Sequence, residues 1–173
     1  DGWLMGTNAG VDPVVVRMDA PTGVYNRPHF VSLVDRAVGD VRGGHHRAED
    51  GPAAGAVAVL SVRILDWEAI GKHIGVVPRD ELAARVARLL EGVLRVDDVL
   101  ARTAEDTFSL LLRGCPDELH DPISGRCRQA VEAERYEADG AWHQLRCVAV
   151  TRSWAGESAA ALVDASFEQL IDG

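Results

Sequence analysis

Residues 95–113 decide the fold, and they read RVDDVLARTAEDTFSLLLR. Two apolar runs, 99–101 and 108–112, stand on either side of the polar segment 103–107. Short apolar runs on either side of a polar segment are typical of the two strands of a β-hairpin. We therefore predict a hairpin here, with acidic side chains such as Asp106 at its tip.

A long amphipathic helix is predicted directly before this hairpin. Its apolar side chains recur at helical spacing and form one stripe, Leu82, Val86, Leu89, Leu90 and Val93. Asp80 is expected to cap this helix or to lie in its first turn, where an acid suits the helix dipole. The apolar stripe predicts that the helix packs onto the sheet that contains the hairpin.

Composition limits the class of protein. With 173 residues, 47% of them hydrophobic, the chain suits one domain with a single core. The formal net charge of -9 argues against nonspecific nucleic-acid binding. No apolar run is long enough to span a membrane and no leader is evident, so we expect a soluble protein. The 3 cysteines lack metal-ligand spacing, and we interpret them as reduced packing residues.

The order of the remaining elements predicts the fold class. We predict a turn entering a helix at 19–30, with Asn26 as its N-cap, a strand buried on both faces at 56–65, a helix at 66–74, a helix at 123–138, a strand at 144–151 and a helix at 158–171. With the hairpin, the order is strand, helix, strand, strand, helix, strand. This is the split βαβ arrangement of a ferredoxin-like α+β sandwich, an antiparallel sheet with helices on one face.

Two segments resemble one family. The turn matches the pattern Asp-x-Leu-Thr-Gly-Leu-x-Asn-Arg-x-x-Phe at Asp19, Thr22, Gly23, Asn26, Arg27 and Phe30. The hairpin tip Ala-Glu-Asp-Thr-Phe stands where GGDEF-domain proteins, the diguanylate cyclases, have Gly-Gly-Asp/Glu-Glu-Phe, and there only Asp106 and Phe108 fit. The resemblance implies a degenerate GGDEF domain at 18–173, preceded at 1–17 by a linker or the tail of an upstream region.

The resemblance also assigns the active-site positions of the family. They fall on Arg63 for the metal-binding strand Asp, on Ala104, Glu105, Asp106 and Thr107 for the signature, and on Gly71 and Asp80 for guanine recognition. A guanidinium at a metal-ligand position inverts the local charge that two divalent cations require. We therefore expect no metal, no cofactor and no catalysis, so a domain that is not an enzyme. Arg63 is expected to pair with Asp106 instead.

A second site of the family, which binds the product cyclic di-GMP, is an Arg-x-x-Asp pattern just upstream of the signature. Arg95 and Asp98 match it, and Arg126 falls where a further arginine would complete it, with Arg128 as the alternative. An arginine fork suits phosphate and the guanine edge, and a carboxylate accepts from guanine donors. A purely structural interpretation, a helix-end cation and a turn residue, also explains Arg95 and Asp98.

Three functions follow as hypotheses. The first is a catalytically inactive, cytoplasmic, bacterial signalling domain that receives cyclic di-GMP through Arg95, Asp98 and Arg126 and is linked to an upstream sensory domain or protein partner. The second is a ligand-free interaction domain, such as a homodimerisation module. The third is a GTP-binding regulator or weak diguanylate cyclase that uses a remnant pocket around Asp80 and Asp106.

Overall fold

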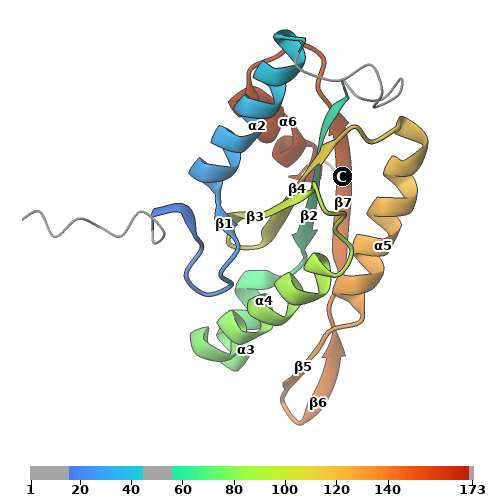
Figure 1. Cartoon of the computed structure of the whole chain (residues 1–173). Helices are drawn as coiled ribbons and strands as arrows, with labels where there is room; N and C mark the ends of the chain where they lie inside the picture. The colour runs from blue at the N-terminus through green and yellow to red at the C-terminus, as the bar shows by residue number, and fades with distance from the viewer. Residues whose placement is uncertain (1–15, 45–55, 172–173) are drawn as a thin grey trace, which may run out of the picture.

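The computed structural model describes residues 16–44 and 56–171 (Figure 1). Residues 1–15 lie outside these ranges, so the assignment of 1–17 to a linker stays a prediction. None of the helices in the described ranges combines the length and the apolar character needed to cross a bilayer.

A five-stranded sheet forms the centre of the molecule, with the strand order β1-β3-β4-β2-β7. Its strands are β1 (Tyr25–Asn26), β2 (Val57–Ile64), β3 (Val99–Ala104), β4 (Thr107–Arg113) and β7 (Cys147–Ser153). The predicted hairpin is therefore β3 and β4. The pairs β3 with β4, β4 with β2 and β2 with β7 are antiparallel, whereas the short β1 is parallel to β3, so the sheet is mixed.

Helices cover both faces of this sheet (Figure 1). One face is packed by α2 (Arg27–Arg42) and α6 (Ala159–Ile171), and we call it the α2 face. The other is packed by α3 (Trp67–Ile74), α4 (Val76–Glu91) and α5 (His120–Glu132), and we call it the α4 face. The fold class is α+β, as predicted. The prediction that helices cover only one face of the sheet is wrong. Strand β2 shows the reason, because it is apolar on both sides.

The first helix follows from its cap. Asn26 has extended backbone, and its side-chain oxygen accepts a hydrogen bond from the backbone nitrogen of His29 at 3.1 Å. Pro28 lies in the first turn, where its missing N–H costs nothing. The buried residues Phe30 and Val34 then face the sheet, one turn apart. The predicted capped turn is confirmed.

Three predicted elements needed correction. Helix α4 begins at Val76 after Gly75, so Asp80 lies in its second turn and does not cap it. Helix α5 ends at Glu132, and a short hairpin follows, formed by β5 (Arg135–Ala138) and β6 (Ala141–Gln144). A 3-10 turn, η2 (Asp117–Leu119), precedes α5. The helix predicted at 158–171 is α6, which begins at Ala159, and its last residue, Ile171, is 57% exposed.

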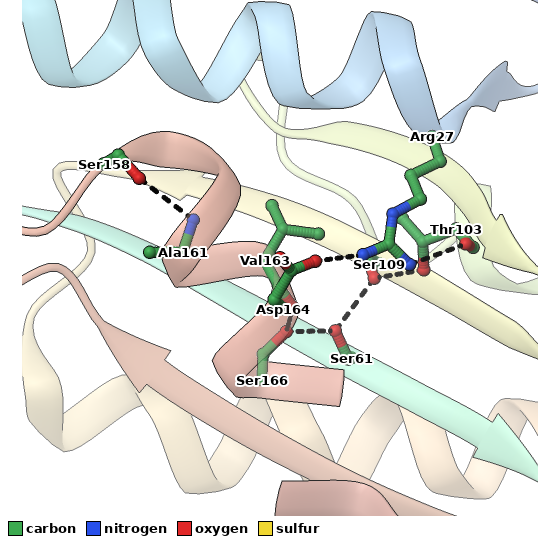
Figure 2. Close-up of polar contacts among 9 residues, drawn as sticks. All are labelled: Arg27, Ser61, Thr103, Ser109, Ser158, Ala161, Val163, Asp164 and Ser166. Atoms are coloured by element: carbon green, nitrogen blue, oxygen red, sulfur yellow. Dashed lines mark hydrogen bonds and ion pairs between the residues drawn. The ribbon is translucent and has the colours of Figure 1, made fainter. Parts of the chain in front are cut away.

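A chain of buried hydroxyl groups joins the sheet to α6 on the α2 face (Figure 2). The Ser109 hydroxyl lies 2.8 Å from the hydroxyls of both Thr103 and Ser61. The Ser61 hydroxyl lies 3.0 Å from that of Ser166, which donates to the carbonyl of Val163 at 2.8 Å. Each of these hydroxyls is buried, and each has a partner, as buried polar groups require.

Candidate functional site

The hairpin tip holds the ion pair that the sequence predicted. Arg63, near the end of β2, donates from Nε to Oδ2 of Asp106 at 3.0 Å. The other carboxylate oxygen of Asp106 accepts from the hydroxyl of Thr107 at 2.9 Å, and its carbonyl accepts from the backbone of Ile64 at 2.7 Å. Both side chains remain partly exposed, so the pair lies at the protein surface.

A cavity of about 450 Å³ opens beside this pair. It is lined by Arg63, Asp66, Trp67, Glu68, Ala69, Lys72 and Asp106. Helix α3 begins here, and Asp66 precedes it with a left-handed backbone (φ 59) and makes no side-chain cap. The first N–H groups of α3 therefore lack a side-chain acceptor. Asp66 instead pairs with Arg146 at 2.7 Å, and Lys72 pairs with Glu68 at 3.0 Å.

The two-cation centre implied by the resemblance does not fit the residues present. Arg63 occupies the strand position and already donates to Asp106. Within residues 16–44 and 56–171, no three His, Cys, Asp or Glu side chains form a group that could hold a metal ion. Hard cations need several oxygen ligands, so we derive no chemical step through a metal here.

The two positions assigned to guanine recognition lie where α3 meets α4. A methyl group added at Gly71 would meet Nη1 of Arg79 at 2.5 Å, so the Arg79 side chain fills the space in front of Gly71. Arg79 also lies over the ring of Trp67, 5.5 Å from its centroid. Sequence reasoning missed Arg79. The sequence feature that could have indicated it is the position of Arg79 beside Asp80, near a helix N-terminus, where acidic residues are normally favoured.

Arg102 connects the hairpin tip to the turn at 19–24. Its side chain is only 7% exposed, and its guanidinium donates to the carbonyl of Glu105 at 3.0 and 2.6 Å and to Asp19 at 3.3 Å. It also lies 5.8 Å from the centre of the Trp67 ring. Asp19 in turn accepts from the hydroxyl of Thr22 at 2.6 Å. Arg102 thus fixes the tip relative to the turn and to α3.

The second predicted site lies in the loop before β3. Asp98 accepts hydrogen bonds from the backbone of Arg95 at 2.9 Å and from its guanidinium at 3.3 and 3.2 Å. The Asp98 side chain is only 2% exposed, whereas that of Arg95 is 40% exposed. Arg95 also donates to the carbonyl of Arg113 at 3.2 Å. The hydrogen bond that Arg95 donates to Asp98 raises the pKa of Arg95. Asp98 therefore holds Arg95 in one orientation.

The two arginines proposed to complete this site point to different surroundings. Burial raises the pKa of the Cys127 thiol to about 11, and the charges of Arg126 and Asp98 act on the same thiol. Arg128 instead lies 3.9 Å from Glu132 and affects the thiol of Cys147. The assignment of Arg126 to this site stays a prediction.

Comparison with known proteins identifies the family. The family described as diguanylate cyclase, GGDEF domain, matches residues 16–146, and the chain belongs to it. A comparison with curated proteins finds no match.

Several solved structures share the fold. The FimX GGDEF domain from Pseudomonas aeruginosa is 21% identical with a TM-score of 0.74, covering 90% of this chain and 92% of that one. The GGDEF domain of DgcB from Caulobacter crescentus, in complex with c-di-GMP, is 15% identical with a TM-score of 0.77, covering 90% and 86%. The diguanylate cyclase SiaD from Pseudomonas aeruginosa, in complex with its activator SiaC, is 19% identical with a TM-score of 0.73; the match covers 90% of this chain but 56% of SiaD.

The family corrects one expectation. We expected a domain that is not an enzyme, and this is wrong, because the family that matches is that of the diguanylate cyclases. The expectation depended on the sign of one side chain, Arg63. The same cavity is lined by three carboxylates, those of Asp66, Glu68 and Asp106, and each of them pairs with a cationic side chain.

Proposed function

We propose that this GGDEF domain is a receptor for cyclic di-GMP, which binds to Arg95 and Arg126, with Asp98 holding Arg95 in place. The observation that carries the proposal is the orientation of Arg95, whose guanidinium is fixed by Asp98 while the side chain remains 40% exposed. A GGDEF domain of the same fold has been solved with c-di-GMP, which supports the ligand class. The proposal includes a cytoplasmic location and an upstream sensory domain or partner protein.

The chemistry of the ligand suits two arginines. Cyclic di-GMP carries two phosphate charges and two guanine bases, and a guanidinium fork binds either a phosphate or the guanine edge with two hydrogen bonds. Arg95 and Arg126 make these contacts. Because Asp98 is 2% exposed and already accepts from Arg95, it positions that arginine and does not contact the ligand. Because Arg95 is already held in one orientation, little further side-chain entropy is lost when a ligand binds to it.

Isothermal titration calorimetry with cyclic di-GMP tests the proposal. We expect binding by the native chain and at least about tenfold weaker binding after Arg95→Ala or Arg126→Ala, since each removes a charge-assisted hydrogen bond. Asp98→Asn keeps the shape but weakens the hold on Arg95, so affinity falls by less. Arg128→Ala is the matched control, because Arg128 lies near Glu132, and its affinity should equal that of the native chain.

Two results would remove the receptor function. One is the absence of heat with cyclic di-GMP, and the other is unchanged affinity in Arg95→Ala. A chain that binds nothing yet self-associates in light scattering would support the alternative, a ligand-free interaction or dimerisation domain.

A second candidate function is formation of cyclic di-GMP from GTP at the cavity beside Arg63 and Asp106. The observation in its favour is the uncapped N-terminus of α3 in the wall of that cavity, because free N–H groups at a helix N-terminus suit phosphate. Incubation with GTP and Mg²⁺, followed by chromatography for cyclic di-GMP, tests it. Product that disappears in Asp106→Asn supports this function, whereas no product from the native chain removes it.

A further inference from the structure

The junction of α3 and α4 contains two buried N–H donors without acceptors. Within the described residues, the indole Nε1 of Trp67 and the Nε of Arg79 are buried and make no hydrogen bond. Trp67 as a whole is only 4% exposed. The guanidinium of Arg79 lies over the same indole ring, 5.5 Å from its centroid.

The surroundings of these donors supply positive charge and few acceptors. The only hydrogen bond that the Arg79 side chain makes among the described residues is a long one, from Nη1 to the carbonyl of Trp67 at 3.4 Å. The same part of the chain holds no carboxylate that pairs with Arg79. Helix α4 begins three residues before Arg79, without a side-chain cap and without an acid in its first turn. A second guanidinium, that of Arg102, lies 5.8 Å from the Trp67 ring.

An unsatisfied buried donor and a half-buried guanidinium without a carboxylate both carry a free-energy cost. A ligand oxygen with negative charge would relieve both costs at once. Gly71 contributes the space, because a side chain there would collide with Arg79. The guanidinium keeps this place only because residue 71 has no Cβ.

We propose that the α3–α4 junction is an anion-binding site, in which Arg79 and the indole N–H of Trp67 bind oxygens of a phosphate group. A guanidinium fork suits a tetrahedral oxyanion, and the indole adds a third donor. The α4 N-terminus favours the same sign of charge. The site is separate from Arg95, Asp98 and Arg126, so this inference does not rest on the receptor function.

The test uses the full chain labelled with ¹⁵N and inorganic phosphate as the probe, at constant ionic strength maintained with chloride. The indole N–H resonance of Trp67 is assigned by its loss in Trp67→Phe. We expect this resonance to move as phosphate is added and to reach a plateau. In Arg79→Ala the phosphate affinity should fall at least about tenfold, because the charged partner is gone.

A second variant avoids dependence on Arg79→Ala folding normally. Gly71→Ala displaces the guanidinium through a steric contact, keeps its charge, and favours helix α3. It should also weaken the phosphate response. Arg36→Ala, which removes an exposed arginine on α2, is the matched control and should respond like the native chain.

Three outcomes would overturn the proposal. A Trp67 resonance that does not move at any phosphate concentration means that water alone satisfies the two donors. A response of native size in both Arg79→Ala and Gly71→Ala means that these residues do not bind the anion. A response lost in Lys72→Ala but kept in Arg79→Ala assigns phosphate to the neighbouring cavity beside Arg63. Calorimetry with cyclic di-GMP should be unchanged in Arg79→Ala, so failure of either proposal is recognised separately.

Discussion

The two faces of the central sheet differ in what holds the helices to them. On the α4 face, β4 presents Phe108, Leu110 and Leu112, which pack with α4 and α5 in one apolar cluster. On the α2 face, the same strand presents Leu111 to a second apolar cluster. It also presents Ser109, whose hydroxyl bonds to Thr103 and Ser61 and, through Ser61, reaches α6 (Figure 2). Neighbouring residues of β4 therefore point to opposite faces of the sheet, where one makes apolar contacts and the next makes hydrogen bonds.

The difference teaches how position is specified on each face. Apolar packing is strong but tolerates changes of shape when volume is kept. Hydrogen bonds between buried hydroxyls contribute less net free energy, yet they demand one register, because a displaced hydroxyl loses its partner and stays buried. The α4 face should therefore dominate stability, and the α2 face should depend on exact pairing.

The largest expected effect is on the α4 face. Phe108 is completely buried, and Phe108→Ala should lower the free energy of unfolding by about 3–5 kcal/mol, the usual cost of such a cavity. Urea unfolding followed by circular dichroism measures this. Phe108→Leu, which keeps most of the volume, is the control and should cost about 1.5 kcal/mol or less. A loss below that of Ser109→Ala would reverse the comparison.

The next effect concerns pH and again the α4 face, where all three thiols lie. Burial raises the pKa of Cys127 to about 11 and that of Cys147 to about 12, from a reference value of 9.0. Above pH 9 the unfolded chain loses thiol protons that the folded chain keeps, so stability falls as pH rises from 9 toward 11. The expected loss at pH 10 is about 1.4 kcal/mol for each thiol.

Urea unfolding at pH 8 and pH 10 checks this slope. In the double variant Cys127→Ala and Cys147→Ala, most of this dependence of stability on pH should disappear, because the two thiols whose protons the unfolded chain releases are gone. Native and double-variant chains that lose equal stability between the two pH values would contradict the assignment.

A smaller effect is expected on the α2 face. Ser109→Ala leaves the hydroxyls of Thr103 and Ser61 buried without that partner, and the free energy of unfolding should fall by about 2 kcal/mol. The sharper test is the combined replacement of Thr103 by Val and of Ser61, Ser109 and Ser166 by Ala. Removing every hydroxyl removes the unsatisfied groups, so the combined variant should be at least as stable as Ser109→Ala. A strictly additive loss would show that packing, not pairing, governs this face.

The smallest effect concerns the start of α2. Asn26→Ala removes the acceptor for the backbone N–H of His29 and should cost about 1 kcal/mol in thermal or urea unfolding. Asn26→Asp keeps that acceptor and should cost less. Equal losses in the two variants would mean that the cap is not the source, and that the bond from Asn26 to the carbonyl of Val16 matters instead.

Most elements of the fold could be predicted from local patterns. The hairpin β3–β4, the buried strand β2 and the capped helix α2 each carry their signal within a few residues. The β5–β6 hairpin was missed although Asp139 and Gly140, with φ 53 and 75, form its turn. Asp-Gly is a strong hairpin signal. However, the residues before it resemble those of α5 in composition, so the helix was predicted to continue through them.

Long-range features could not be predicted in this way. The hydroxyl of Ser61 bonds to Ser166, which is 105 residues later, and nothing near either serine indicates the other. The pair of Arg63 and Asp106 was predicted because the family resemblance brought the two positions together. Arg79 was missed because its contact with Gly71 depends on how α3 and α4 pack.

Arg102 has a mechanical consequence. One guanidinium binds Asp19 in the turn at 19–24 and the carbonyl of Glu105 in the hairpin tip, and it lies over Trp67 at the start of α3. Three segments distant in sequence therefore cannot shift independently without breaking its bonds. A displacement of Asp19 would therefore reach the hairpin tip directly through this side chain, in addition to the pairing of β1 with β3.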